Sequence, residues 1–222
     1  MAEDRELALI VGAGPGLGLA LAKAVGAAGF DLGLVLRVGD DQAPYRKALE
    51  SLPVSCALHA CEAGHLPFLE KVLKEIQAAD RPAGILVYNA SRGTPGTPTA
   101  LTPRDLLSDF GVNAAGALCA VQAVLPGMRA RGGGTILLTG GGSALHPKVG
   151  EASLSLGKGA LRTLALLLAE ELEPEGIHVA TVTIDGFVKA GTALDPDRVA
   201  QCFLELHAEA PGAWRRELVL PD

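Results

Sequence analysis

Four glycines lie close together near the start of the chain, at Gly12, Gly14, Gly16 and Gly18. Glycine has no Cβ, so a backbone built from it can turn sharply and come close to a ligand. The first N–H groups of a helix that begins at such a turn are unpaired and carry partial positive charge. Because these groups bind phosphates, the chemistry open to this stretch is to hold a diphosphate.

The spacing of the glycines separates two dinucleotide-binding motifs. G-x-G-x-x-G fits badly, because it places Leu17 or Leu19 where its third glycine should stand. G-x-x-x-G-x-G fits fully, and a glycine-rich turn without a ligand is the alternative. We expect five residues to hold the diphosphate: Gly12, Gly14, Gly16, Leu17 and Gly18.

A strand before the glycines and a helix after them must position this turn. Residues 7–11 are apolar and partly β-branched, which is typical of a strand buried on both faces. A helix is expected to begin near residues 15–17 and to end near residues 26–29. The motif therefore has the strand-turn-helix context that dinucleotide binding requires.

Apolar strands and amphipathic helices alternate along the rest of the chain. This order predicts an α/β fold with a single doubly wound parallel sheet of the Rossmann type and helices on both faces. No repeat or linker divides residues 1–222, so we expect one dinucleotide-binding domain. The further strands are expected at 31–36, 54–58, 85–88, 135–139, 177–184 and 217–220, and the further helices begin near 41, 66, 102, 153 and 195.

Arg37 stands at the carboxyl end of the second expected strand. An acidic residue at this place bonds the ribose hydroxyls of NAD, whereas an arginine suits the 2′-phosphate of NADP. Arg37 therefore favours NADP as the cofactor. A solvated Arg37, with Asp40 or Asp41 binding the ribose of NAD, remains the alternative.

Composition excludes several classes of protein. The formal net charge of -6 and the isoelectric point near 5.4 leave no clustered basic face for a nucleic acid. The first residues are charged and acidic, and no apolar run reaches the roughly 20 residues of a membrane span. We expect a soluble, cytoplasmic protein that binds neither nucleic acid nor membrane.

The four cysteines show no C-x-x-C spacing, and we expect them to be reduced. His59, Cys61 and His65 could form half of a metal site, but no second half follows. We therefore predict no metal site. The cysteines are Cys56, Cys61, Cys119 and Cys202.

Five motifs in order make the chain resemble the short-chain dehydrogenase/reductase family over residues 7–220. The resemblance implies a nicotinamide dinucleotide as cofactor, with Asn89, Ala90, Lys158 and Gly186 among its ligands. The motifs are Gly12-x-x-x-Gly16-x-Gly18, Tyr88-Asn89-Ala90-Ser91, Gly111-Val112-Asn113-Ala114-Ala115-Gly116, Gly157-Lys158-Gly159-Ala160-Leu161 and Asp185-Gly186.

The resemblance also implies hydride transfer between the nicotinamide and a carbonyl or alcohol carbon, with a tyrosine that moves the matching proton. Leu154 stands where that tyrosine is expected, and leucine cannot carry a proton. The family's serine aligns with Gly140 or Gly141, so that Ser143 is displaced by two or three residues. The catalytic residues that the resemblance leaves are Asn113, Ser143 and Lys158.

Other side chains could supply the proton. His146 follows the loop after the fifth strand, and imidazole changes its charge near neutral pH. Tyr45 and Tyr88 are not placed to replace the missing tyrosine, and Asn113 could simply be a polar residue packed inside a helix. The remaining candidates are Ser153, Ser155, Glu151 and Asp185.

Few residues separate Gly186 from Asp195, where members of the family commonly insert a helical lid. We therefore expect an open pocket. The resemblance also implies a homodimer face on the helices near residues 104–128 and 153–172. Two hypotheses follow. The first is an NADP-preferring oxidoreductase that acts on a small carbonyl or alcohol substrate at an atypical site. The second is an inactive dinucleotide-binding module, serving as a sensor or as a dimerisation partner.

Overall fold

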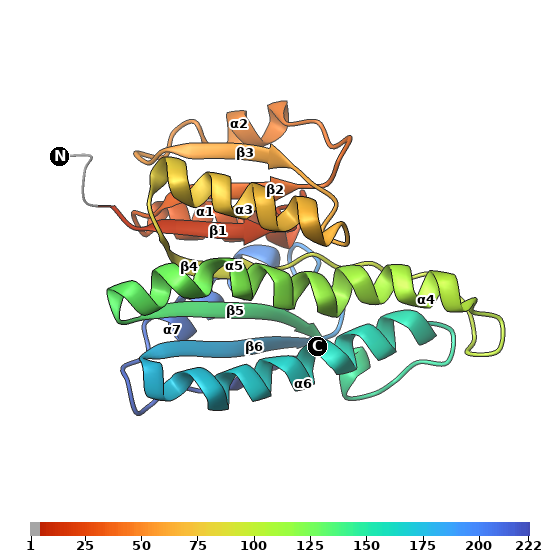
Figure 1. Cartoon of the computed structure of the whole chain (residues 1–222). Coiled ribbons are helices and arrows are strands. Elements are labelled where there is room, and N and C mark those ends of the chain that lie inside the picture. Colours follow the sequence, from red (N-terminus) through yellow and green to blue (C-terminus); the bar gives the residue numbers. More distant parts are fainter. Residues whose placement is uncertain (1–4) are drawn as a thin grey trace.

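The sheet is parallel and has seven strands in the order β3-β2-β1-β4-β5-β6-β7 (Figure 1). The structure, a computed structural model, describes residues 5–222 apart from the side chains of residues 79 and 80. The strand order reverses at β1, so the carboxyl ends of β1 and β4 form the switch point where doubly wound folds bind ligands. The strands are β1 Leu7–Val11, β2 Asp31–Leu36, β3 Cys56–Ala60, β4 Ala83–Tyr88, β5 Gly134–Gly141, β6 Ile177–Asp185 and β7 Glu217–Pro221.

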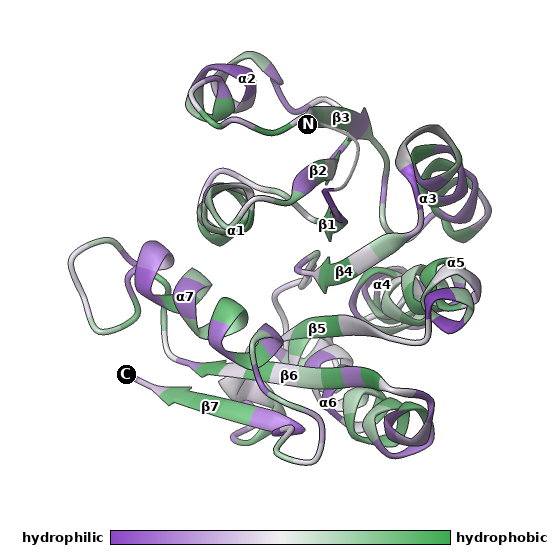
Figure 2. Cartoon of the chain, turned by 90° about the vertical axis from the view of Figure 1, so that its left-hand side faces the viewer, coloured by the Kyte–Doolittle hydropathy of each residue, from purple (hydrophilic) through white to green (hydrophobic). Residues whose placement is uncertain are grey.

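Helices cover both faces of the sheet (Figure 2). The first face carries α1 and α7, and the second carries α3, α4, α5 and α6. The predicted fold class, a doubly wound parallel sheet with helices on both faces, is confirmed. The helices are α1 Leu17–Ala27, α2 Ala43–Leu49, α3 Leu66–Asp80, α4 Pro103–Phe110, α5 Gly116–Arg131, α6 Ala152–Leu172 and α7 Pro196–His207.

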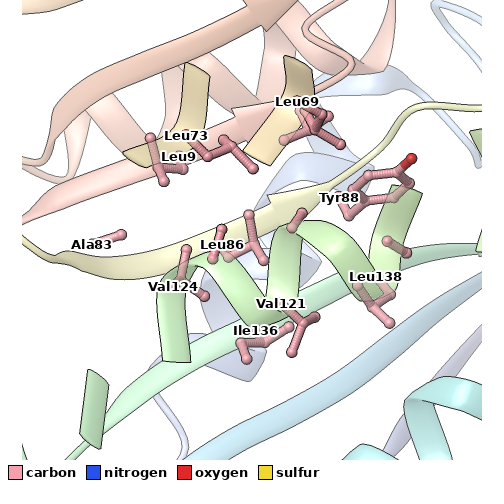
Figure 3. Close-up of a cluster of buried hydrophobic side chains, with 14 of the residues drawn as sticks. Leu9, Leu69, Leu73, Ala83, Leu86, Tyr88, Val121, Val124, Ile136 and Leu138 are labelled. Carbon is pink, nitrogen blue, oxygen red and sulfur yellow. The ribbon is translucent and has the colours of Figure 1, made fainter. Parts of the chain in front are cut away.

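The core between the sheet and α3 and α5 is apolar. Leu9, Leu86 and Ile136 on the strands lie toward Leu69 on α3 and Val121 on α5, in the close-up of Figure 3. All five are buried. Burying a leucine, isoleucine or valine side chain stabilises a fold by about 1.5–3 kcal/mol, so this layer fixes the strand ends that carry the site.

Sequence signals placed most element ends, with two corrections. The predicted caps are present, because Thr102 Oγ1 accepts the Asp105 N–H at 3.1 Å and Asp195 Oδ1 accepts the Asp197 N–H at 3.0 Å. The third strand, however, is Cys56–Ala60 rather than 54–58, because its register is fixed by pairing with β2. The helix expected near residues 104–128 ends later, since α5 continues past Pro126 to Arg131 and stops at a left-handed glycine.

Two helical stretches are long and apolar enough to cross a membrane by length and composition alone: Pro103–Arg131 and Ala152–Glu175. This corrects the expectation that no apolar run is long enough. Half of the most apolar window of each is buried inside the fold. Because a helix packed on a core is equally apolar on its buried side, this composition says little about a membrane.

Candidate functional site

The glycine turn after β1 is shaped by close backbone contacts. Gly12 has a positive φ of 87°, and a Cβ at this position would lie 2.6 Å from Ala90 Cα. The Gly12 N–H donates to Val35 O at 2.9 Å, and Asn89 Nδ2 donates to Gly12 O at 2.8 Å. The turn is thereby fastened to the ends of β2 and β4.

The other glycines of the motif divide into two kinds. A Cβ at Gly18 would lie 2.6 Å from Gly12 O, so Gly18 allows α1 to pack on the turn. Cβ atoms at Gly14 and Gly16 would meet nothing within 4 Å. No side chain caps α1 at Gly16. The Leu19 N–H donates to Gly14 O at 2.8 Å, so the N–H groups of Leu17 and Gly18 are the ones left for a ligand.

A cavity of about 780 Å³ opens beside this turn at the carboxyl ends of β1, β2 and β4. It has the size of a cofactor site. Its position at the switch point, with open space over Gly14, fits the diphosphate of a dinucleotide. Five of the predicted cofactor residues line this cavity, namely Gly12, Gly14, Arg37, Asn89 and Ala90, and the other five, Gly16, Leu17, Gly18, Lys158 and Gly186, are not among its lining residues.

Arg37 reaches the cavity rim, where Nη2 lies 3.2 Å from Asp40 Oδ1. Asp41 also lines the cavity, and its Oδ1 accepts the Ala43 N–H at the start of α2. An exposed arginine with one acidic partner can still bind a phosphate. Both the arginine and the acidic residues that sequence reasoning named therefore line this cavity, after the carboxyl end of β2.

Lys158 is buried beneath the end of β5, with 6% of its surface exposed. Its Nζ donates to Thr139 O at 2.8 Å, and burial lowers its pKa from 10.5 to about 8. A Cβ at Gly141 would lie 3.6 Å from Lys158 Cγ. The residue expected to hold a serine thus lies against the lysine but offers no hydroxyl.

Asn113 is fully buried in a π-helical turn, residues 111–115, between α4 and α5. Its Oδ1 accepts the Arg92 N–H at 3.0 Å and the Ser91 hydroxyl at 3.2 Å. Its Nδ2 donates to Arg92 O at 2.6 Å. The amide is therefore occupied by the loop after β4, which matches the alternative of polar packing inside a helix.

Leu154, on the first turn of α6, packs on the same loop. A Cβ at Gly93 would lie 3.0 Å from Leu154 Cβ. The hydroxyls beside it are used within the chain. Ser153 donates to Asp109 Oδ2 at 2.7 Å, and Ser155 accepts the Lys148 N–H at 3.1 Å. The Ser153 proton is therefore used within the chain, whereas Ser155 only accepts in this arrangement.

Ser143, His146 and Asp185 gather at the ends of β5 and β6. Ser143 is buried in the short helical turn 142–144. His146 Nε2 lies 3.8 Å from Asp185 Oδ2. A Cβ at Gly186 would lie 2.5 Å from Leu194 Cδ1, so Gly186 packs against Leu194 in the loop before α7.

Three cavity residues escaped sequence reasoning: Tyr45, Glu62 and Arg92. Glu62 and Arg92 follow β3 and β4, so the rule that ligands bind at carboxyl ends of parallel strands could have found them. Tyr45 is on α2, and no local signal points it toward the cavity. Among residues 5–222, no group of three or more potential metal ligands is found.

The family model described as short chain dehydrogenase matches residues 6–198. A very-long-chain 3-oxoacyl-CoA reductase of Emericella nidulans is 32% identical over 180 residues, covering 79% of this chain and 52% of that protein. A 2,3-dihydro-2,3-dihydroxybenzoate dehydrogenase of Escherichia coli is 29% identical over 181 residues, covering 78% and 66%. The chain spans about half the length of the fungal reductase.

Solved structures share the fold. A metagenomic short-chain oxidoreductase in complex with NADP has a TM-score of 0.89 at 24% identity, covering 100% of both chains. The L-sorbose reductase of Gluconobacter frateurii, complexed with NADPH and L-sorbose, has a TM-score of 0.88 at 22% identity. That match covers 100% of this chain and 97% of the other.

Proposed function

The chain belongs to the short-chain dehydrogenase family, and we propose that it is an NADP-preferring oxidoreductase that acts on a small carbonyl or alcohol substrate. The observation that carries this proposal is the glycine turn, whose open side at Gly14 borders a cavity of about 780 Å³. A nicotinamide dinucleotide bound there would supply or accept a hydride. Gly12, Gly14, Gly16 and the start of α1 would hold its diphosphate.

The proton has to come from a residue other than Leu154. Lys158 lies outside the lining of the cavity, at the end of β5 against Gly141, and we propose it as the donor because burial lowers its pKa to about 8. A general acid works best when its pKa is near the working pH. In reduction, the carbonyl carbon would gain the hydride and its oxygen would gain a proton from Lys158 Nζ. Thr139 O holds that Nζ in place at 2.8 Å.

We predict that Arg37→Asp weakens NADPH binding more than NADH binding. The variant removes the guanidinium that lies at the rim beside Asp40 and places a carboxylate where the 2′-phosphate would sit. Losing a charge-assisted hydrogen bond typically costs about 1.5–3 kcal/mol, or roughly ten- to a hundredfold in affinity. Calorimetric titration with both cofactors measures this, and equal weakening would show that Arg37 does not touch the 2′-phosphate.

The function is tested by following NADPH absorbance with a panel of aldehydes, ketones, quinones and 3-oxoacyl thioesters. The thioesters are included because the fungal relatives are named 3-oxoacyl-CoA reductases. We expect NADPH to be consumed with at least one carbonyl class. Clear NADPH binding without turnover of any class would overturn the enzyme proposal.

A binding module without turnover is the second candidate, and a specific observation favours it. Leu154 and Gly141 both lack a titratable group, and Ser153 donates its hydroxyl proton to Asp109. Such a protein would hold the dinucleotide as a sensor or as a partner for an active relative. The absorbance assay, run beside a calorimetric titration with NADPH, separates the two functions.

We further propose a homodimer formed through α4, α5 and α6. These helices share one outer layer (Figure 2), and Leu107 is 72% exposed there. Sedimentation equilibrium should give twice the mass of the chain. The Leu107→Glu variant should give a mass closer to that of the monomer. A monomer at every concentration would contradict this. The other large apolar side chains exposed on these helices are Phe110, Leu118, Leu156 and Leu167.

A further inference from the structure

An ion pair at the edge of the cavity has no part in the function proposed above. Arg92 lines the cavity directly after β4, and its Nε lies 3.2 Å from Asp109 Oδ1. Asp109 is fully buried on α4, whereas the Arg92 side chain is 56% exposed. The contact is an ion pair without a hydrogen bond, because Asp109 Oδ1 has no hydrogen-bond partner in the described part of the chain. A buried carboxylate therefore attracts a guanidinium that itself remains accessible.

Asp109 is charged at neutral pH. Burial alone would raise the pKa of its carboxyl, but hydrogen bonds from Ser153 and Thr94 and the charge of Arg92 lower it below the ordinary value. Its Oδ2 accepts the Thr94 N–H at 2.6 Å and the Ser153 hydroxyl at 2.7 Å. Buried ion pairs of this kind are seldom retained for stability, because desolvation costs as much as the attraction returns.

The backbone of Arg92 is held by two hydrogen bonds to Asn113. Asn113 Oδ1 accepts from Arg92 N at 3.0 Å, and Asn113 Nδ2 donates to Arg92 O at 2.6 Å. The main chain is thus preorganised, which lowers the entropy that binding must offset. Because the Arg92 side chain is 56% exposed, its guanidinium can present N–H groups to an oxyanion.

The position of Arg92 complements that of Arg37. In the sheet β1 lies between β2 and β4, so Arg37 after β2 and Arg92 after β4 stand on opposite sides of the glycine turn. Arg37, which is exposed, is paired with half-buried Asp40 at the β2 side of the cavity. Arg92 lies at the other end, beside the loop that packs on Leu154.

We propose that Arg92, positioned by Asp109 and Asn113, binds an oxyanion of the molecule in this cavity, a phosphate or a carboxylate group. The oxyanion has two sources, which are the cofactor's diphosphate and an anionic group of the substrate. The inference rests on the proposed function only in taking this cavity as the ligand site. Asp109 acts here as a positioning residue.

The test is a set of calorimetric titrations on the full chain and on Arg92→Met. The probes are inorganic pyrophosphate and NADPH, followed by acetoacetyl-CoA and the neutral acetoacetyl N-acetylcysteamine thioester on protein saturated with NADP. Arg104→Met, an exposed arginine of α4 outside the cavity lining, is the matched control. Thermal melts check that each variant folds, and Arg92→Lys keeps the charge without the fork if Arg92→Met does not fold.

Arg92→Met should weaken the binding of the oxyanion that Arg92 contacts by about ten- to a hundredfold. Arg104→Met should leave the affinity for every probe unchanged. Loss of pyrophosphate and NADPH binding assigns the cofactor's diphosphate. Loss of acetoacetyl-CoA binding, with the neutral thioester unaffected, assigns the substrate. Unchanged affinity for every probe in the Arg92 variants overturns the inference. Wild-type protein that binds pyrophosphate but not NADPH refutes the proposed cofactor while leaving the Arg92 comparison intact.

Discussion

Replacing Lys158 with methionine should make the protein more stable at pH 7, by about 2–3 kcal/mol, while turnover falls by about a hundredfold or more. Burial lowers the pKa of Lys158 from 10.5 to about 8. At pH 7 the lysine is charged both folded and unfolded, so the folded state carries the full cost of burying that charge. Methionine fills a similar volume without a charge, and loses only the bond to Thr139 O.

The pH dependence fixes the sign of this effect. Between pH 8 and 10.5 the unfolded chain binds more protons than the folded one, so wild-type stability rises with pH in this window. The advantage of Lys158→Met should therefore be full below pH 8 and shrink as pH rises toward 10.5. Urea unfolding at pH 7 and pH 9.5 measures the difference in the free energy of unfolding between Lys158→Met and wild type. The contributions of other titrating groups cancel in this difference.

Lys23→Met is the matched control, because Lys23 is exposed on α1 and its loss should change stability by less than about 0.5 kcal/mol. A Lys158→Met protein that is less stable than wild type at pH 7 would show that the lysine is held by contacts stronger than its desolvation. Turnover that survives in the variant would remove Lys158 as the proton donor and leave His146 beside Asp185 to be tested next.

The sequence was most informative where a local pattern has one physical solution. Residues 7–11 are uniformly apolar and are followed by glycines, so they predicted β1, the turn and α1 together. Thr102 and Asp195 announced two helix starts, because their side chains cap the N–H groups that every helix leaves open. These signals act over a few residues, which is why they can be read from one chain.

Contacts between residues far apart in the sequence could not be predicted from it. Arg92 and Asp109 each look like ordinary surface charges in the sequence, and only the fold brings Nε to 3.2 Å from the carboxylate. The register of β3 depends on its pairing with β2, and the burial of Lys158 depends on how α6 packs on β5. Gly186 belongs to a motif that implies a cofactor contact, whereas in the fold it packs against Leu194.

Two glycine substitutions in the same motif should separate the fold from the ligand. Gly12→Ala should destabilise the protein by about 2–5 kcal/mol, because φ is 87° and a Cβ would overlap the backbone of Asn89 and Ala90. Strain at a positive φ and overpacking each cost roughly 1–3 kcal/mol. Gly16→Ala should leave stability within about 0.5 kcal/mol of wild type, since its Cβ would meet nothing within 4 Å.

Binding should respond differently from stability. The space over Gly16 is where the proposed diphosphate approaches the start of α1, so Gly16→Ala should weaken NADPH binding by about tenfold or more although the fold is intact. Urea unfolding and calorimetric titration of both variants measure the two effects separately. If Gly16→Ala binds NADPH as wild type does, the diphosphate does not lie over this turn, because a methyl group added to occupied space must displace the ligand.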